Sequence, residues 1–233
     1  MSADRLSIII PVLNEEPGIV AALEALSSPR SRGAEVIVVD GGSADRTVAL
    51  ARPMCDRLIV APRGRAAQMN AGAAAAHGNI LLFLHADTAL PPEADRLVAE
   101  ALAHSGRAWG RFDVRISGRH PLFPLIAAMM NLRSRVTGIA TGDQAIFVDK
   151  TAFAAVGGYP DIDLMEDIVL SRRLKRVSRP LSLAARALTS ARRWEKHGVV
   201  RTILTMWRLR LAFFFGAAPD KLAARYGYAP RQR

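Results

Sequence analysis

Four short apolar runs, separated by segments with helical spacing, constrain the fold of this chain more than any other feature. The runs are Leu6–Ile10, Glu35–Asp40, Arg57–Ala61 and Ile80–Leu84. Strands that alternate with helices in this way form right-handed βαβ units, whose parallel strands are buried on both faces. The sequence therefore predicts an α/β fold with a mostly parallel central sheet. Ser43 is the predicted N-cap of the helix that follows the second run.

The second half of the chain departs from this rhythm. A helix is expected over 93–103, and alternating polar and apolar residues over 109–117 predict a half-exposed strand. The apolar segment 120–132 has the length of a core or interfacial helix. "LMEDIVLSRRLKR" begins with acidic and ends with basic residues, as the helix dipole favours. Because no repeat or long linker divides the chain, one domain is predicted.

The charge and the cysteine content narrow the classes of partner and of site. The 233 residues carry a formal net charge of +11, which favours anionic partners such as nucleotides, nucleic acid or acidic lipid headgroups. Cys55 is the single cysteine, so intrachain disulfides and cysteine-based zinc sites are excluded. No run resembles a signal peptide or reaches the ~18 residues of a membrane span. A cytoplasmic protein is therefore expected.

Clusters of polar residues follow three of the predicted strands. "PVLNEE" follows the first strand, "DGGSADRT" the second and "HADT" the fourth. Ligands of parallel sheets bind beyond the carboxyl ends of the strands, where His85 and Asp87 would emerge. The alternative for each cluster is a turn or a cap, with Asp87 capping the next helix. Neither G-x-G-x-x-G nor G-x-x-x-x-G-K-[ST] occurs, which argues against a dinucleotide dehydrogenase and a P-loop NTPase.

Four motifs, in order, resemble those of family 2 glycosyltransferases with the GT-A fold. They are "IIIPVLNEE", "VIVVDGGSADRT", "RGRAAQMNAGAAAAHGNILLFLHADT" and "GGYPDIDLMEDIVLSRRLKR", and the resemblance extends from Leu6 to about Lys196. "FLHADT" and "ARRW" further resemble small bacterial enzymes related to carotenoid-acid glucosyltransferases. The family implies a Rossmann-like three-layer sandwich over 1–198, with a nucleotide-sugar half over 1–90 and an acceptor half over 91–198. Residues 199–233 would then form a C-terminal amphipathic helix and tail.

The resemblance assigns donor contacts to positions in the first half of the chain. Pro11, Asn14 and Glu15 would line the nucleotide base and ribose, and Asp40 would accept a hydrogen bond from the uracil N–H. Asp87 would hold Mn²⁺ or Mg²⁺, which bridges the diphosphate and neutralises charge on the leaving group. The other first-half positions that the resemblance places at the nucleotide sugar are Gly42, Ser43, Arg63, Arg65, Asn70, His85 and Ala86.

The D-x-D motif that is usual in the family is H-x-D here, because His85 takes the first position. His85 could replace a hydrogen bond to the ribose, or add a nitrogen ligand that would favour Mn²⁺ over Mg²⁺. The alternative is a strand-end histidine that donates to a backbone carbonyl. His197 lies where some GT-A enzymes present a further metal ligand, although any exposed histidine at a helix end would look the same.

The carboxylates of "LMEDIV" are the predicted catalytic groups. Asp167, in the E-D pattern of the family, would be the general base, and Glu166 would orient it or the acceptor. The alternative is that both residues only stabilise a helix N-terminus. Direct attack on the anomeric carbon would invert its configuration.

Two further motifs complete the predicted site. "TGDQ" resembles the family's loop under the donor sugar, where Gly142 would allow close backbone approach and Asp143 would bind sugar hydroxyls; the alternative is an ordinary turn. "SARRW" resembles a reduced form of Q-x-x-R-W, with Ser190 in place of the glutamine. In that motif Arg193 would pair with the diphosphate, and Trp194 would also bind the nucleotide sugar.

The segment "VVRTILTMWRLRLAFFFGAAP" predicts an amphipathic helix. Arg201 and Arg208 share one face, while Leu204, Trp207 and Phe214 gather on the other. Such a helix suits an anionic membrane surface, so we expect peripheral attachment to the inner face of the cell membrane. The alternative is a helix docked on the protein's own sheet.

Together these features predict an inverting, metal-dependent transfer of a hexose from a UDP-sugar, or another NDP-sugar, to a lipid-like acceptor. A nucleotidyltransferase is the alternative enzyme, although "PVLNEEPG" supplies acids where such enzymes usually have a Gly-rich, basic loop. The alternative outside the enzymes is a protein that only binds nucleic acid or membrane surfaces. That alternative leaves Asp40, Asp87 and Asp167 without a role.

Overall fold

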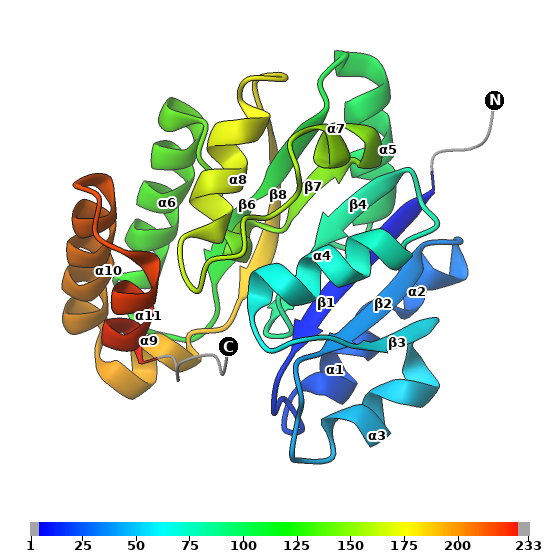
Figure 1. The fold of residues 1–233 in the computed structure, drawn as a ribbon, viewed down its shortest axis with the longest axis horizontal. Coiled ribbons are helices and arrows are strands. Elements are labelled where there is room, and N and C mark those ends of the chain that lie inside the picture. Colours follow the sequence, from blue (N-terminus) through cyan, green and yellow to red (C-terminus); the bar gives the residue numbers. More distant parts are fainter. Residues whose placement is uncertain (1–4, 228–233) are drawn as a thin grey trace.

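The computed structural model describes residues 5–227, which form an eight-stranded sheet covered by helices (Figure 1). The order of the strands across the sheet is β3 (Arg57–Val60), β2 (Glu35–Asp40), β1 (Leu6–Val12), β4 (Ile80–Phe83), β7 (Ile146–Asp149), β6 (Trp109–Ile116), β8 (Leu181–Thr189) and β5 (Thr88–Ala89). β7 and β5 are antiparallel to their neighbours, and the other strands share one direction. The predicted α/β fold with a mostly parallel sheet is confirmed.

Two sets of helices bury the two faces of the sheet. The first face packs on α1 (Ile19–Glu24), α3 (Thr47–Ala51) and α5 (Ala94–Ser105), with the short α2 (Ser27–Ser31) and the 3-10 turn η1 (Arg52–Met54) beside them. The second face packs on α4 (Arg65–Ala75), α7 (Lys150–Ala155) and α8 (Glu166–Leu174). Ile8 and Ile9 show the alternation: Ile8 belongs to the first core and Ile9 to the second, and both are fully buried.

The remaining helices lie at one end of the sheet, at the left of Figure 1. They are α6 (Phe123–Thr137), α9 (Arg192–His197), α10 (Val199–Phe214) and α11 (Pro219–Tyr226). Phe123 and Ala127 of α6 pack on Ile116 and Ala191, and Leu209 of α10 packs on Leu222 of α11 and on the start of α8. No helix within residues 5–227 is long and apolar enough to cross a membrane.

Two local predictions and one alternative differ from the structure. Ser43 does not cap a helix, because its Oγ donates to Asp40 at 2.5 Å and α3 begins only at Thr47. Asp87 does not cap the next helix either, since β5 follows it and the N-cap of α5 is Glu93. Strand 109–117 is less exposed than expected: in β6, between β7 and β8, Arg111 is 0% exposed and Asp113 is partly buried, while Arg115 is exposed.

Candidate active site

A cavity of about 560 Å³ opens beyond the carboxyl ends of β1, β4 and β8. Its volume is in the range of small-molecule sites. Its walls come from the loops after these strands, the start of α4, the 3-10 turn η2 (Gly142–Gln144), the start of α8, and α9, α10 and α11. The predicted site residues that line it are Asn14, Glu15, Arg65, His85, Asp87, Gly142, Asp143, Glu166, Asp167, Arg193, Trp194 and His197.

The loops after β1 and β2 are joined by hydrogen bonds between side chains and backbone. Val12 is paired with Asp40 in the parallel ladder, so the two loops leave the sheet side by side. The backbone N–H of Asn14 donates to Ser43 Oγ at 2.9 Å, and Asn14 Oδ1 accepts from the N–H of Ala44 at 2.9 Å. Asn14 has a φ of +54°, a conformation that asparagine tolerates better than most residues. These contacts hold Asn14 and Glu15 at the cavity wall.

Asp87 is brought to the same wall by the pairing of β5 with β8. Thr88 is paired with Thr189, and the N–H of Ser190 donates to the carbonyl of Asp87 at 3.0 Å. The guanidinium of Arg192, at the start of α9, then lies between two carboxylates. It donates to Glu15 at 3.2 Å and lies 3.9 Å from Asp87 Oδ2. The Asp87 side chain is 36% exposed, so its oxygens can reach a ligand in the cavity.

His85 contacts the turn η2 rather than a backbone carbonyl. Its Nδ1 lies 3.3 Å from Asp143 Oδ1, and its ring covers Gly142. A Cβ built on Gly142 would lie 2.3 Å from Cε1 and Nε2 of His85, so only glycine fits beneath the imidazole. Burial acts to raise the pKa of Asp143, but the hydrogen bond and charge of His85 outweigh it and hold that pKa below its usual value.

Glu166 and Asp167 form the first turn of α8, directly after Met165, whose φ is +70°. Asp167 Oδ2 accepts from the N–H of Gly142 at 3.1 Å, and Oδ1 accepts from the N–H of Ile168 at 2.7 Å. Glu166 is buried. Burial, reinforced by the charge of Asp167, raises the pKa of Glu166 to about 7. Glu166 therefore gains or loses its proton near neutral pH.

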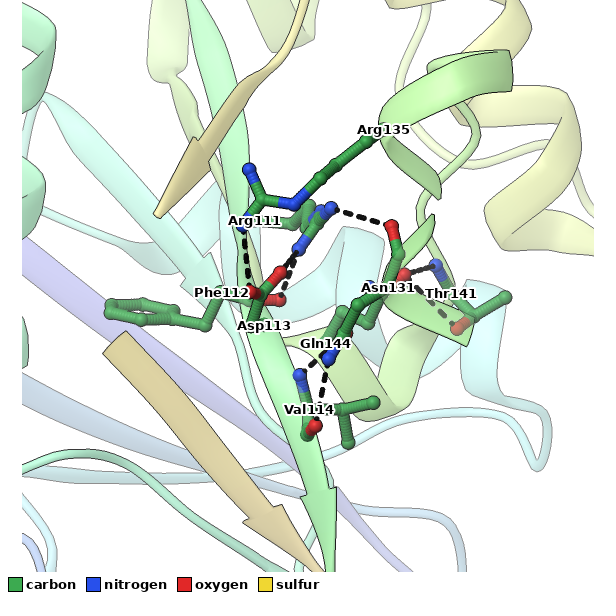
Figure 2. A network of polar contacts seen from close by, with 8 residues as sticks. All are labelled: Arg111, Phe112, Asp113, Val114, Asn131, Arg135, Thr141 and Gln144. Carbon is green, nitrogen blue, oxygen red and sulfur yellow. Dashed lines mark hydrogen bonds and ion pairs between the residues drawn. The ribbon is translucent and has the colours of Figure 1, made fainter. Parts of the chain in front are cut away.

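A buried polar network supports the turn η2 from behind (Figure 2). The side chain of Asn131 donates to the carbonyl of Val114 and accepts from its N–H, and Gln144 Nε2 donates to Asn131 Oδ1 at 3.4 Å. Gln144 Oε1 accepts from the N–H of Thr141 at 3.2 Å, which closes a capping box around the turn. Gln144 is 0% exposed. Through these bonds the sheet fixes the position of Gly142 and Asp143.

Arg193 faces the C-terminal helix. Its Nη2 donates to the carbonyl of Tyr226 at 2.7 Å, and its guanidinium lies 3.5 Å from the centre of the Tyr226 ring. Trp194 packs edge-on against Phe123, with ring centres 6.4 Å apart. In this structure the neighbouring Arg192, not Arg193, is the arginine beside Asp87.

Some residues predicted to contact the donor do not line the cavity. They are Pro11, Asp40, Gly42, Ser43, Arg63, Asn70 and Ala86. Asp40 is buried, and its carboxylate accepts hydrogen bonds from the N–H groups of Gly42 and Ser43. This is the turn-forming role that was the alternative to nucleotide binding for its cluster. The amide of Asn70 is used on the backbone of Tyr159, which it contacts at 2.8 and 3.0 Å. We therefore assign Asn70 to the support of that loop rather than to the donor.

The residues present fit a divalent cation that arrives with a nucleotide. No group of three His, Cys, Asp or Glu side chains within the described part of the chain is arranged to hold a metal ion alone. Mn²⁺ and Mg²⁺ sites of nucleotide enzymes commonly use one or two carboxylates together with substrate phosphates. Asp87, accessible at the cavity wall, can supply such a carboxylate. Ligation by His85 or His197 stays a prediction.

Several lining residues have no counterpart in the predicted site. They are Met130, Leu164, Met206, Leu209, Arg210 and Tyr226, besides Arg192. Arg192 lies within the "ARRW" motif, directly before the predicted Arg193. That neighbouring position was a signal that could have identified it as a candidate. The residues of α10 and α11 carry no such signal, because only the docking of these helices brings them to the cavity.

A family model supports the enzymatic interpretation. Residues 7–156 match the family described as "Glycosyl transferase family 2". A PGL/p-HBAD biosynthesis glycosyltransferase of Mycobacterium bovis is 38% identical over 108 residues, which are 43% of this chain and 42% of that protein. An undecaprenyl-phosphate 4-deoxy-4-formamido-L-arabinose transferase of Pseudomonas paraeruginosa is 34% identical over 110 residues, 42% of this chain and 32% of that protein. The matches thus span less than half the length of these curated relatives.

Solved structures agree on the fold. The mannosyltransferase PcManGT from Pyrobaculum calidifontis, solved with GDP-Man and Mn²⁺, superposes with a TM-score of 0.63 and 23% identity, over 97% of this chain and 66% of that one. The S. aureus TarS 1-349 structure with UDP superposes with a TM-score of 0.63 and 18% identity, over 80% of this chain and 60% of that one. The chain therefore has the GT-A fold.

Proposed function

Because this chain belongs to glycosyl transferase family 2, we propose that it transfers a hexose from a nucleoside diphosphate sugar to a lipid-like acceptor. The observation that carries the proposal is the convergence of two carboxylates on one cavity. Asp87 arrives from the end of β4 and Asp167 from the start of α8. Asp87 would hold the cation that binds the diphosphate, and Asp167 would face the acceptor hydroxyl.

The donor is a UDP-sugar or another NDP-sugar. The solved structures that share the fold contain UDP in one case and GDP-Man with Mn²⁺ in another, so both bases are tested below. Asp87 and the diphosphate would together hold Mn²⁺ or Mg²⁺, which would neutralise charge on the leaving group. Arg192 lies 3.9 Å from Asp87, and we place it rather than Arg193 beside the diphosphate. Its positive charge favours the phosphates there.

Asp167 acts as the general base. It takes the proton of the acceptor hydroxyl while the acceptor oxygen attacks the anomeric carbon, and the bond from that carbon to the diphosphate oxygen breaks. The electron pair leaves with the nucleoside diphosphate, and the configuration at carbon inverts. The hydrogen bond from Gly142 holds Asp167 in place, while Glu166 beside it, with a pKa of about 7, supplies a second carboxyl group that changes its protonation near neutral pH.

The acceptor side favours an amphiphile. The curated relative from Pseudomonas paraeruginosa is named for an undecaprenyl-phosphate substrate, and the narrower resemblance of "FLHADT" and "ARRW" is to carotenoid-acid glucosyltransferases. An apolar face on α6 and α10 supports attachment to an anionic membrane surface. Its exposed members are Leu125, Met129, Leu132, Val136, Val200, Leu204, Trp207, Leu211 and Phe214. The net charge of +11 favours the same surface.

The test is a thermal-shift titration with UDP, GDP, ADP and CMP, each with and without Mn²⁺. A nucleotide at 100 times its dissociation constant should stabilise the protein by about 2.7 kcal/mol. We expect one of the diphosphates to raise Tm in the presence of Mn²⁺, and Asp87→Asn to abolish the Mn²⁺-dependent part. Glu24→Gln, an exposed carboxylate on α1, is the matched control. Transfer of radiolabelled hexose from the preferred donor to a membrane lipid extract should then depend on Asp167.

Two outcomes would overturn the proposal. If no nucleotide shifts Tm, with or without Mn²⁺, the cavity is not a donor site. If the protein instead binds RNA or DNA in a salt-sensitive way that Asp87→Asn does not change, its basic charge serves nucleic acid.

A further inference from the structure

A second, smaller cavity of about 180 Å³ is walled by α9, α10 and the end of α11. These helices meet at the left of Figure 1. The residues that line the small cavity are Arg193, His197, Arg201, Thr202, Thr205, Met206, Arg225, Tyr226 and Gly227. It adjoins the larger cavity, because Met206 and Tyr226 line both. Arg201, Thr205 and Arg225 line the small cavity alone, and the proposed transfer gives them no role.

The wall of the small cavity is basic. Three arginines and one histidine line it, and no Asp or Glu among residues 5–227 does so. The segment 228–233, which follows Gly227 in the sequence, contains no Asp or Glu either. The larger cavity differs, because carboxylates such as Asp87 and Asp167 line it. The small cavity therefore has an excess of positive charge that no acidic side chain in its wall neutralises.

Two of these arginines have unused donors. Arg201 lies in the first turn of α10 and Arg225 in the last turn of α11, and both are exposed, so a solute can reach them. Neither side chain makes a hydrogen bond or an ion pair within the described part of the chain. Thr202 donates its hydroxyl to the carbonyl of Gly198 at 2.8 Å, whereas the hydroxyl of Thr205 makes no such bond to the described residues.

Arg193 prepares the same wall for an anion. It donates to the carbonyl of Tyr226 at 2.7 Å and so satisfies a group at the end of α11, whose partial negative charge would oppose an anion. The first two turns of α10 contribute Arg201 and Thr205 and belong to the positive end of that helix. The arginines that share this wall repel one another, and an oxyanion between them would remove the repulsion.

The size of the cavity and its donors favour one phosphate group. Small-molecule sites commonly measure ~300–1,000 Å³, so this cavity is too small for a nucleotide. A phosphate group carries about −1.5 to −2 charges at neutral pH and three strong acceptor oxygens, whereas a carboxylate has one charge and two oxygens. Guanidinium groups match such oxyanions with two parallel hydrogen bonds. Two arginines and a hydroxyl therefore suit a phosphate better than a carboxylate.

We propose that Arg201, Arg225 and Thr205 bind a phosphate group in the small cavity. The phosphate is either a free ion or the end of a ligand that extends past Tyr226 into the larger cavity. The inference goes beyond the proposed glycosyl transfer, since the site uses neither Asp87 nor a metal ion.

The test is calorimetric titration with inorganic phosphate and with glycerol 3-phosphate, at constant ionic strength and with EDTA present. We expect saturable binding to wild-type protein, and at least 10-fold weaker binding to Arg201→Gln/Arg225→Gln, which loses charged hydrogen-bond donors. Arg208→Gln on α10 and Lys221→Gln on α11 are the matched controls, because both residues are exposed and line neither cavity. Each control should bind phosphate as wild type does.

Two further readouts sharpen the test. Arg201 and Arg225 are exposed, so the double variant should keep the Tm of wild type in the absence of phosphate. Equal affinities for the two probes would identify a site for the phosphate ion itself. If glycerol 3-phosphate binds at least 10-fold more tightly, the phosphate belongs to a larger ligand.

Three results would overturn the inference. The first is the absence of saturable binding to wild-type protein. The second is equal binding by wild type and Arg201→Gln/Arg225→Gln, above all if Arg192→Gln abolishes it, because the phosphate then lies beside Asp87 in the larger cavity. The third is an equal loss in Arg208→Gln or Lys221→Gln, which would show attraction by net charge without a site.

Asp87→Asn separates this inference from the proposed function. The variant should lose the Mn²⁺-dependent binding of nucleotide and keep phosphate binding in EDTA. If nucleotide binds and phosphate does not, glycosyl transfer stands and the phosphate site fails. If phosphate binds through Arg201 and Arg225 and no nucleotide binds, the phosphate site stands and the proposed function fails.

Discussion

The backbone nitrogen of Gly142 lies 3.1 Å from Oδ2 of Asp167 and donates a hydrogen bond to it. This bond ties the turn η2 to the first turn of α8, two elements that follow different strands. The imidazole of His85 covers the same glycine and contacts Asp143. One residue without a side chain thus couples the proposed base to the end of β4, where Asp87 emerges.

Gly142→Ala should reduce catalysis more than stability. A Cβ at this position would lie 2.3 Å from the His85 ring, so the ring or the turn must move and the bond to Asp167 is weakened. We expect kcat to fall at least 10-fold, on the order of 1.4 kcal/mol, with Tm lowered by only a few degrees. Steady-state transfer assays and thermal unfolding measure the two effects.

Gly18→Ala is the control for this substitution, because Gly18 has a negative φ and open space around its Cβ position. It should leave kcat and Tm near wild type. Wild-type kcat in Gly142→Ala would contradict the positioning role of the turn.

Glu166 makes the folded state less stable as pH rises. In the unfolded chain its carboxyl group has an ordinary pKa near 4.5, whereas burial and the charge of Asp167 raise the folded pKa to about 7. Between these values the native state binds more protons, so the free energy of unfolding falls as pH increases. Each unit of pKa shift corresponds to about 1.4 kcal/mol, so the full titration of the group should cost on the order of 3 kcal/mol.

Urea unfolding of wild type and Glu166→Gln at pH 5 and pH 7.5 measures this contribution. The variant should gain stability relative to wild type as pH rises from 5 to 7.5, since glutamine does not ionise. Glu24→Gln should show no such gain. Parallel pH dependences of wild type and Glu166→Gln would show that the folded and unfolded pKa values of Glu166 are alike.

Asp113→Ala should destabilise the protein strongly. Asp113 is the carboxylate partner of Arg111, which is 0% exposed and whose pKa is already lowered by burial. Removing one partner of a buried ion pair commonly costs 3–5 kcal/mol, and a loss of about that size is expected in urea unfolding. The apolar double variant Arg111→Met/Asp113→Leu should recover most of it.

Glu93→Ala is the surface control for this experiment. Glu93, the N-cap residue of α5, makes no capping hydrogen bond with its side chain and pairs with Arg96 at the surface, where such pairs contribute little. Equal stability of Asp113→Ala and Glu93→Ala would mean that the network in Figure 2 does not support the fold.

Trp207→Ser/Phe214→Ser should weaken binding to anionic vesicles. These side chains are 68% and 70% exposed on α10, so their replacement removes apolar surface without disturbing the core. Sedimentation with phosphatidylglycerol vesicles should show at least 10-fold weaker binding, with nucleotide binding unchanged. Val177→Ser changes an exposed apolar residue outside α6 and α10 and should bind as wild type does. If the double variant binds the vesicles as tightly as wild type, these apolar side chains do not contribute to binding. Only the net positive charge would then explain any attachment.

Local periodicity was enough to predict much of the first half of the molecule. β2 matches its predicted range, and β1, β3 and β4 differ from theirs by only one or two residues at the end. A strand's direction determines where its carboxyl end lies, so Asn14, Glu15, His85 and Asp87 were correctly expected to share one edge of the sheet. These features depend on residues close together in sequence.

The tertiary structure decided the rest, because the deciding contacts join residues distant in sequence. β8 was not predicted, since its Ala- and Ser-containing segment becomes a strand only between β6 and β5. The polar residues of β6 were expected in solvent; Arg115 is exposed, but Arg111 is buried, where it donates to the carbonyl of Asn131 on α6 and pairs with Asp113. Arg192 and Arg193 are adjacent in one motif, and neighbouring side chains on a helix point about 100° apart. Only the docking of α9 determines that Arg192 lies beside Asp87 while Arg193 contacts Tyr226.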